Sequence, residues 1–466
     1  MRRDIMMTDT TLLTDSQMQD FIYNGMLSVK SSLPASTHDD ICRALAAWLA
    51  EHDNPGNDIL ARVPKLKTIF QDPVVTGALT SILGPRYLIH RHRHCHDHLP
   101  GAKAQNIHKD YPAGGNIRGH HPRLVLILYY PHAVTSEMGP TAVQPGSQFY
   151  GSPQADLDEL TLCCEGGTVV ITHYEIWHRA TENRSTDTRF MIKFLGVRTQ
   201  EPTEPAWHAT SPHWAHSGHE VLQHNDVCRH IWRWYLGESA VPVPELDGDE
   251  PDNEVRPSVA ESGGGDRLRV NEYYRRSTLG KKALPDLMKA MIAEAELRWE
   301  TNLNKGDFTN PSQLDVLFGL AAMGSPAVDL AGQHLTHPNE RVRAAAAATL
   351  GIMGAPAHRA TEMLGMALKD DNEWVRRNAA EALGNIGVRA EKAIPVLMAA
   401  LEDRRPVTRW SLSEDGFREN VMMALLKIIP DEKRDAFPVF KTLDQDPSEY
   451  IRSWARQMVA GVGGMY

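Results

Sequence analysis

The sequence predicts an α+β protein in two parts, in which a β-sandwich or β-barrel precedes an all-α solenoid. Three observations lead to this expectation. Short apolar strands separated by Gly, Pro and Asn turns occupy residues 87–194, a pattern typical of a sandwich or barrel. A stretch rich in acids, Pro and Gly follows at residues 245–266. Beyond it, the chain repeats itself with a period of about 33 residues.

The composition of the 466-residue chain is that of an ordinary folded protein of two or three domains, since 42% of its residues are hydrophobic and 23% are charged. The longest apolar run, residues 124–130, is far shorter than the roughly 20 residues that cross a bilayer. The N-terminus has no apolar core of a secretory signal, so we expect no membrane association and a cytoplasmic location. The net charge of −10 offers no electrostatic footprint for DNA or RNA, so nucleic acid is not an expected partner.

The first expected elements are two helices around a short strand. A helix is predicted over residues 17–23, a strand over 26–29 and an amphipathic helix over 41–49. The strands predicted after them are residues 87–98, 124–130, 142–144, 168–172 and 190–197. A further helix is expected over about 219–235, within a segment rich in Trp and His.

The domain boundary is expected in the acidic, Pro- and Gly-rich stretch, because so few apolar residues there cannot form a core. We therefore predict one domain over residues 1–240, a linker or disordered loop over 241–270, and a helical domain over 271–466. The histidines agree with this division, since 19 of the 22 lie before residue 231.

The C-terminal part contains internal repeats. Residues 342–354 align with 375–387 at an offset of 33, and shorter copies occur at 320–327, 421–428 and 450–452. The copy at 421–428 is displaced by 42, which a nine-residue insertion around 404–416 explains. Such periods predict stacked helical pairs, and the pattern resembles HEAT-like repeats over about 310–460. Arg343, Arg376 and Arg452 recur at one position of the repeat and are expected to pair with nearby acids.

Two residues of the β-rich part carry metal-ligating chemistry at a strand-like spacing. His108 and Asp110 are two residues apart, so both side chains leave the same face of an extended segment and can bind one ion. A histidine from a late strand edge would complete a 2-His-1-carboxylate site, and His178 fits that position. Such a site leaves positions open for O2 and for a bidentate 2-oxo acid. An anionic cosubstrate also needs a cation, which Arg189 supplies.

These features occur in an order that resembles the phytanoyl-CoA dioxygenase-like family of Fe(II)- and 2-oxoglutarate-dependent oxygenases over about residues 13–198. The resemblance rests on the opening helix and strand, His108 with Asp110, residues 138–141 followed by 145–147, the strand after Gly167, His178 with Asn183, and Arg189 eleven residues after His178. It implies an oxygenase core with a double-stranded β-helix of jelly-roll or cupin-like type. It also implies that His108, Asp110 and His178 bind Fe(II) and that Arg189 binds the C5 carboxylate of 2-oxoglutarate.

The activity that the resemblance implies is hydroxylation of an unactivated C–H bond of a small metabolite or natural-product intermediate. O2 is the oxidant, and succinate and CO2 are the co-products. In halogenating members a small residue replaces the carboxylate ligand, whereas this chain keeps Asp110. Two alternatives stay open, namely a non-catalytic β-barrel with a HEAT scaffold for protein–protein interaction, and an oxygenase whose protein- or carrier-bound substrate is recruited by the repeats. We expect the repeats to form a homodimer contact or to dock within the chain, supporting the fold or closing the pocket.

Several assignments have competitors in the sequence. His173 and Arg184 are also eleven residues apart, so a shifted pair is an alternative to His178 and Arg189. The resemblance also implies a second residue on the C1 carboxylate side of the cosubstrate; the sequence does not identify it, and Arg91 and Arg93 are candidates. The alternating histidines are expected to line or approach the pocket rather than to bind a second metal, because one ion reaches only two residues of a single strand; they are His90, His92, His94, His96 and His98.

Overall fold

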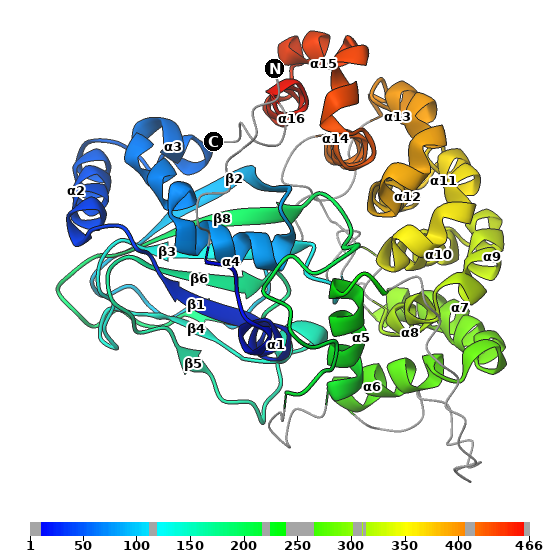
Figure 1. Cartoon of the computed structure of the whole chain (residues 1–466), viewed down its shortest axis with the longest axis horizontal. Coiled ribbons are helices and arrows are strands. Elements are labelled where there is room, and N and C mark those ends of the chain that lie inside the picture. The colour runs from blue at the N-terminus through cyan, green and yellow to red at the C-terminus, as the bar shows by residue number, and fades with distance from the viewer. Residues whose placement is uncertain are drawn as a thin grey trace.

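The computed structural model describes residues 11–110, 119–216, 224–238, 265–301, 310, 314–405 and 415–460. We call residues 11–238 the β-rich part and residues 265–460 the repeat part (Figure 1). Most of the predicted linker and most of the predicted insertion around 404–416 lie outside the described residues. The last residues of the predicted linker are helical, because α6 begins at Asp266. Among the described helices, none has both the length and the apolar character needed to cross a membrane.

The strands of the β-rich part form two antiparallel sheets. The larger sheet has the order β1 (Met26–Lys30), β6 (Thr168–His173), β3 (Leu124–Tyr130), β8 (Arg189–Arg198) and β2 (Tyr87–His98). The smaller sheet has the order β5 (Leu160–Thr161), β4 (Thr141–Val143) and β7 (His178–Ala180). This architecture confirms the predicted double-stranded β-helix. Strands β5 and β7 were not predicted, because two or three residues are too few to show an alternating pattern.

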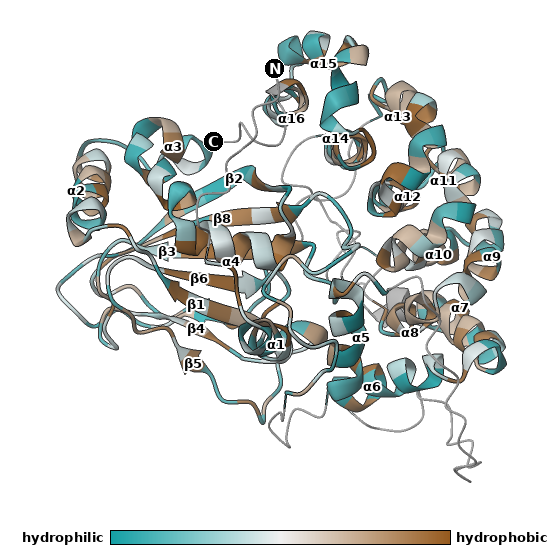
Figure 2. Ribbon diagram, viewed as in Figure 1, coloured by the Kyte–Doolittle hydropathy of each residue, from teal (hydrophilic) through white to brown (hydrophobic). Residues whose placement is uncertain are grey.

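The central strands of the larger sheet, β3, β6 and β8, are buried on both faces. On β3, Val125 and Ile127 belong to the main core, whereas Leu126 and Leu128 belong to a second apolar cluster inside the barrel. The main core includes residues of the sheet and of the helices α1 (Asp15–Asn24), α2 (Ala35–Glu51), α3 (Ile59–Arg62) and α4 (Pro73–Leu83), and it continues into the repeat part. Figure 2 shows the resulting apolar character of β3, β6 and β8. Two buried faces explain why these strands read as continuous apolar runs rather than alternating ones.

The repeat part is an arc of helices whose inner row faces the sheets (Figure 1). Helices α5 (Asn225–Tyr235), α6 (Asp266–Ser277) and α7 (Leu284–Thr301) lead into it. The inner row contains α8 (Val316–Ala322), α10 (Glu340–Met353), α12 (Glu373–Ile386), α14 (Gly416–Ile428) and α16 (Glu449–Ala460). The outer row contains α9 (Ser325–Gln333), α11 (Thr361–Ala367), α13 (Ile394–Ala400) and α15 (Val439–Thr442). The stacked helical pairs confirm the prediction of a solenoid.

The recurring arginines perform the same task in each repeat. Arg343 donates to the carbonyls of His337 and Pro338, and Arg376 donates to those of Asp370 and Asp371. Arg452 donates to the carbonyls of Asp446 and Pro447, again five and six residues before the arginine. The predicted acidic partners are present for two of the three, since Arg343 pairs with Asp370 at 2.7 Å and Arg376 faces Asp403 at 3.7 Å. These side chains therefore tie each inner helix to the turn before it.

Arg123 connects the two parts of the chain. Arg123 donates through Nε and Nη2 to the two carboxylate oxygens of Glu201 at 2.7 and 2.8 Å, and Trp234 donates to the same carboxylate at 2.9 Å. Arg123 Nη2 also donates to the Ile352 carbonyl on α10, at 3.1 Å. Burial raises the pKa of Glu201, but attraction to Arg123 and these hydrogen bonds outweigh it and hold the pKa below its ordinary value. The repeats thus dock within the chain. Docking within the chain was one of the two expectations for the repeats, and a homodimer contact was the other.

We predict that Arg123→Met destabilises the chain by about 3–5 kcal/mol, because the substitution leaves the buried Glu201 carboxylate without its cation. The urea-unfolding transition at pH 7 measures this loss. Arg184→Met is the matched control, since Arg184 pairs with Glu137 on the surface with 61% and 57% of the two side chains exposed. That control should change stability by less than about 1 kcal/mol. Equal effects of the two substitutions would contradict the prediction.

Candidate active site

His108 and His178 lie directly opposite each other in a short antiparallel bridge. The backbone N–H of each donates to the carbonyl of the other at 2.9 Å. Their side chains therefore leave the same face, with ring centroids 4.6 Å apart. His178 begins β7, whose pairing with β4 places His178 opposite Val143. The smaller sheet thus positions both imidazoles.

Hydrogen bonds to the main chain fix which nitrogen of each imidazole faces the site. His108 Nδ1 lies 2.9 Å from the Asn106 carbonyl, and His178 Nδ1 lies 3.0 Å from the Ile176 carbonyl. A carbonyl only accepts, so each Nδ1 carries the proton and each Nε2 keeps a lone pair. The two Nε2 atoms lie 3.9 and 3.8 Å from Asp110 Oδ1. One ligand atom from each of the three residues falls within 4.8 Å of the others, as a metal site requires.

Lys193 holds the other oxygen of the Asp110 carboxylate. Its Nζ donates to Asp110 Oδ2 at 2.8 Å, which turns Oδ1 toward the two imidazoles. Burial raises the pKa of Asp110, but attraction to Lys193 and His178 outweighs it and lowers the pKa below the ordinary value. Burial also lowers the pKa of His178. The resulting carboxylate and neutral imidazole are the protonation states that bind a divalent cation.

Arg189 is a buried cation inside the barrel, with only 1% of its surface exposed. Its Nη1 donates to Thr141 Oγ1 at 3.4 Å, and Tyr130 donates to the same hydroxyl at 3.1 Å. Among the described residues, no carboxylate pairs with this guanidinium, and its Nε has no hydrogen-bond partner. Burial of the charged guanidinium lowers the pKa of Arg189 below its ordinary value. An anionic ligand would supply the missing partner, and a carboxylate matches the planar fork of donors.

The alternating histidines of β2 form the wall between these groups. His92 and His96 both feel the charges of Lys193 and Asp110, and His96 also feels that of Arg189. Burial lowers the pKa of His92 to about 4 and that of His96 to about 3, so both are neutral. The expectation that these histidines approach the pocket holds for this pair. His90 lies in the irregular stretch of the β2–β8 register between Ile89 and Arg93, and its ring contacts Trp454 of α16.

The competing assignments lie elsewhere. His173 Nε2 lies 3.2 Å from the His120 carbonyl, and the described histidines and acids that cluster as metal ligands do not include it. Arg184 forms its surface pair with Glu137. Arg91 pairs with Glu449 of α16 and with Asp58, and Arg93 donates to the Arg91 carbonyl. These contacts turn Arg91 toward the repeat part.

Lys193 is the residue that sequence reasoning missed. The strand over 189–198 alternates, so residues 189, 191, 193 and 195 share one face. Arg189 was already assigned to the pocket, and this alternation would have placed Lys193 there as well. The sequence therefore indicates that Lys193 faces the pocket, provided that Arg189 on the same strand is first assigned to the pocket.

Two parts of the chain match known protein families. Residues 35–191 match the phytanoyl-CoA dioxygenase (PhyH) family, and residues 367–460 match HEAT repeats. No curated relative matches the chain significantly. Similar solved structures include the non-heme monooxygenase ThoJ–Ni complex, at 16% identity over 41% of this chain and 83% of that chain with a TM-score of 0.33. The α-ketoglutarate-dependent carbocyclase SnoK from nogalamycin biosynthesis aligns at 14% identity over 40% and 85% with a TM-score of 0.34. EctD from S. alaskensis, with 2-oxoglutarate and 5-hydroxyectoine, aligns at 16% identity over 41% and 78% with a TM-score of 0.36.

The family matches confirm the resemblance seen in the sequence, over a shorter range in each part. The half-buried 2-His-1-carboxylate cluster, and a buried guanidinium that pairs with no described carboxylate, fit the cofactors of that family. The alternative of a non-catalytic scaffold is therefore set aside. Residues 35–191 match the phytanoyl-CoA dioxygenase family model, and the chain is a non-heme oxygenase that uses Fe(II), 2-oxoglutarate and O2 and carries HEAT repeats.

Proposed function

We propose that the enzyme hydroxylates an unactivated C–H bond of a small metabolite or natural-product intermediate, with succinate and CO2 as co-products. In this proposal His108, Asp110 and His178 bind Fe(II), and Arg189 binds the C5 carboxylate of 2-oxoglutarate. The oxygenase domain is residues 1–240, and a linker over about 241–270 joins it to the repeat domain, residues 271–466. The observation that carries the proposal is Arg189, a buried cation without a described carboxylate partner, inside the barrel that holds the three ligands.

Each residue has a separate task in this proposal. Bound Fe(II) supplies the redox chemistry that couples the oxidation of 2-oxoglutarate with that of the substrate by O2. The two Nδ1 contacts keep both imidazoles in the tautomer that presents Nε2. Lys193 holds Asp110 Oδ2, so that only Oδ1 faces the imidazoles. Arg189 orients the cosubstrate from the opposite side, where burial excludes water that would weaken the ion pair.

A small substrate is favoured over a macromolecule by the way the repeats dock. The inner row of repeat helices faces the barrel, and Arg123 and Tyr450 both form contacts across the boundary. The concave face of the arc, which solenoids use to bind partners, is thus occupied by the chain itself. A carrier-bound substrate would have to approach from another side.

We predict that His178→Ala lowers Fe(II) affinity at least about 100-fold, because it removes one of three protein ligands. His173→Gln is the matched control, since it removes the competing imidazole while retaining polar groups near the His120 carbonyl. Calorimetric titration of Fe(II) under nitrogen measures both variants. Loss of binding in His173→Gln, with His178→Ala unaffected, would reverse the ligand assignment.

We predict that Arg189→Ala weakens 2-oxoglutarate binding by about two orders of magnitude, the effect of losing a charge-assisted bidentate contact. Metal affinity should change much less, because Arg189 is not a ligand. Titration of 2-oxoglutarate into Mn(II)-loaded protein measures the first effect, and Mn(II) titration measures the second. Arg184→Ala should leave both affinities at the wild-type value. Parallel losses of metal and cosubstrate binding in Arg189→Ala would speak against an anchor role.

We predict oxygenation without halogen incorporation, because the carboxylate of Asp110 fills the position that a halide would occupy. The assay is mass spectrometry of products formed in a lysate supplied with enzyme, Fe(II) and 2-oxoglutarate in chloride buffer. A product heavier than its precursor by one oxygen atom is expected. A chlorinated product of the wild-type enzyme would refute the prediction.

A further inference from the structure

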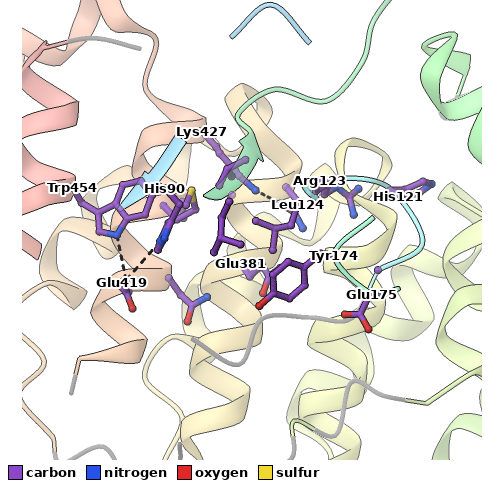
Figure 3. Close-up of a pocket in the computed structure, with 18 of the residues that line it drawn as sticks. His90, His121, Arg123, Leu124, Tyr174, Glu175, Glu381, Glu419, Lys427 and Trp454 are labelled. Atoms are coloured by element: carbon purple, nitrogen blue, oxygen red, sulfur yellow. Dashed lines mark hydrogen bonds and ion pairs between the residues drawn. The ribbon is translucent and has the colours of Figure 1, made fainter. Parts of the chain in front are cut away.

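A cavity of about 70 Å³ lies between the barrel and the inner row of repeat helices (Figure 3). The β-rich part contributes one wall, which includes Leu124, Tyr174, Glu175, Leu195 and Val197. Helices α12, α14 and α16 contribute the other wall, which includes Glu381, Glu419, Met423, Lys427 and Trp454. Neither part of the chain forms this cavity alone.

The position of the cavity along β8 separates it from the proposed cosubstrate anchor. Arg189, Lys193 and Leu195 share one face of this strand. At about 3.3 Å per residue, Lys193 lies about 13 Å and Leu195 about 20 Å along the strand from Arg189. Lys193 donates to Asp110, and Leu195 lines the cavity. A molecule in the cavity would therefore reach the candidate metal ligands from the side opposite to Arg189.

The charged residues on the β-rich wall have partners within the chain. Arg123, which lines the cavity, pairs with Glu201 at 2.7 Å, and Glu175 pairs with Lys109 at 3.3 Å. Burial lowers the pKa of His90 to about 3, so this ring of the lining is neutral. The guanidinium and carboxylate charges of this wall are therefore already engaged.

The charged residues on the repeat wall have partners as well. Lys427 is attracted to Glu381, against the burial that lowers its pKa to about 8. Glu419 accepts a hydrogen bond from Trp454 Nε1 at 3.4 Å and attracts the guanidinium of Arg377. A charged ligand would have to leave water although the counter-charges of the described lining residues are already engaged, which makes its binding costly. The lining therefore favours an uncharged ligand.

Apolar and aromatic side chains form much of both walls. On the β-rich wall they are Leu124, Tyr174, Leu195 and Val197, and on the repeat wall they are Met423, Ala424 and Trp454. Transfer of a hydrocarbon chain from water to such surroundings is favourable, because apolar surface is removed from water on both sides.

One face of α14 lines the cavity. Its residues follow the i, i+3, i+4 and i+7 spacing of a single helix face, and they are Asn420, Met423, Ala424 and Lys427. Gly384 of α12 lets α14 approach closely, since a Cβ there would lie 2.9 Å from the Ala424 Cα. Met423 is the partly buried apolar side chain of this face, and a methionine adapts its shape to what it contacts. Among the repeat residues, Met423 is therefore best placed to limit the length of an apolar ligand.

We propose that this cavity binds the substrate as an uncharged, largely apolar molecule, and that Met423 of the repeat helices determines how much of that molecule fits. The engaged charges disfavour an ion, the apolar walls favour hydrocarbon, and the cavity follows the candidate metal ligands along β8. The repeats would then take part in substrate specificity. This inference rests on the proposed function, because it names the class of molecule that the oxygenase positions.

The size of the cavity agrees with part of a small molecule. One water occupies about 10–15 Å³ by the same measure, so a space of about 70 Å³ holds about five heavy-atom groups. A chain of about five carbon atoms is therefore a suitable probe, and the rest of a larger substrate would extend toward the barrel.

The test compares three probes of similar length, namely pentan-1-ol, pentylammonium and pentanoate. The full-length protein carries Zn(II) and 2-oxoglutarate, so that no oxidation occurs, and saturation-transfer NMR measures the affinity of each probe. We expect pentan-1-ol to bind about tenfold more tightly than either ion, because an ion loses its hydration in the cavity. The probe protons should relax faster with Mn(II) in place of Zn(II), because the cavity follows the metal ligands along β8.

Variants of Met423 test its part in the cavity. Met423→Trp should fill the space and lower the affinity for pentan-1-ol about tenfold, whereas the affinities for Mn(II) and 2-oxoglutarate should stay at the wild-type values. Met423→Ala should make heptan-1-ol the tighter-binding alcohol, because the shorter side chain leaves room for a longer chain. Met366→Trp is the matched control and should behave like wild type, since Met366 lies on the outer helix α11 with 65% of its surface exposed.

Other outcomes overturn the inference. Binding of pentylammonium or pentanoate as tight as that of pentan-1-ol would show that the cavity takes an ion. Unchanged pentan-1-ol binding in Met423→Trp, or equal probe relaxation in protein that has bound Mn(II) or Zn(II), would place the probe outside the cavity. If Met423→Trp does not fold, as judged by circular dichroism, the chain-length preference of Met423→Ala decides in its place.

Succinate formation by the wild-type enzyme from Fe(II), 2-oxoglutarate and O2 is measured separately. Its absence would reject the proposed function. Its presence without a preference for the alcohol would reject only the assignment of the cavity.

Discussion

The backbone bridge between His108 and His178 is the constraint on which the site depends. Two hydrogen bonds of 2.9 Å force the two residues into register, and the strand period then places Asp110 on the face of both imidazoles. The bridge exists only because β7 is held by β4 in the smaller sheet. A shift of one residue in that pairing would turn His178 to the opposite face. The short strands of the smaller sheet are the hardest to predict from the sequence, yet they determine where the candidate metal ligands lie.

A second constraint links the oxygenase to its repeats. Arg123 directly precedes β3 and reaches both Glu201 and the Ile352 carbonyl, so one side chain connects the end of a central strand with α10. Tyr450 on α16 accepts a hydrogen bond from Asn57 near the other end of the arc. With both ends anchored, α12 and α14 between them are held over the mouth of the barrel. A solenoid with its concave face docked in this way acts as a wall of the enzyme rather than as a free binding surface.

The sequence predicts those features that arise from local patterns. Strands β2 and β3 have the predicted bounds, and α10 and α12 begin 33 residues apart, as the repeat requires. The triad was proposed from spacing and family resemblance, and the structure brings its ligand atoms within 4.8 Å. What could not be predicted depends on distant contacts. Lys193 and Asp110 are 83 residues apart, and His90 contacts Trp454 of α16 from an irregular stretch of the β2–β8 pairing. Glu419 reaches the mouth of the barrel from α14 through the docking of the repeats.

The buried arginines show why Arg189 points to a ligand rather than to a structural ion pair. Arg123, Arg377, Arg418 and Arg434 are buried, and each pairs with a carboxylate of the chain. Arg198 is the informative exception, since it donates to the carbonyls of Ile82 and Gln200 and lies over the ring of Trp234. Among the described residues, Arg189 has neither a carboxylate partner nor a set of backbone carbonyls like that of Arg198. Its one hydrogen bond goes to Thr141, at 3.4 Å. A guanidinium desolvated to this degree is costly without an anion, and none of the described carboxylates pairs with it, which favours a bound anion as its partner. In the proposed function the dicarboxylate cosubstrate is this partner, so cosubstrate binding would stabilise the barrel as well as serve catalysis.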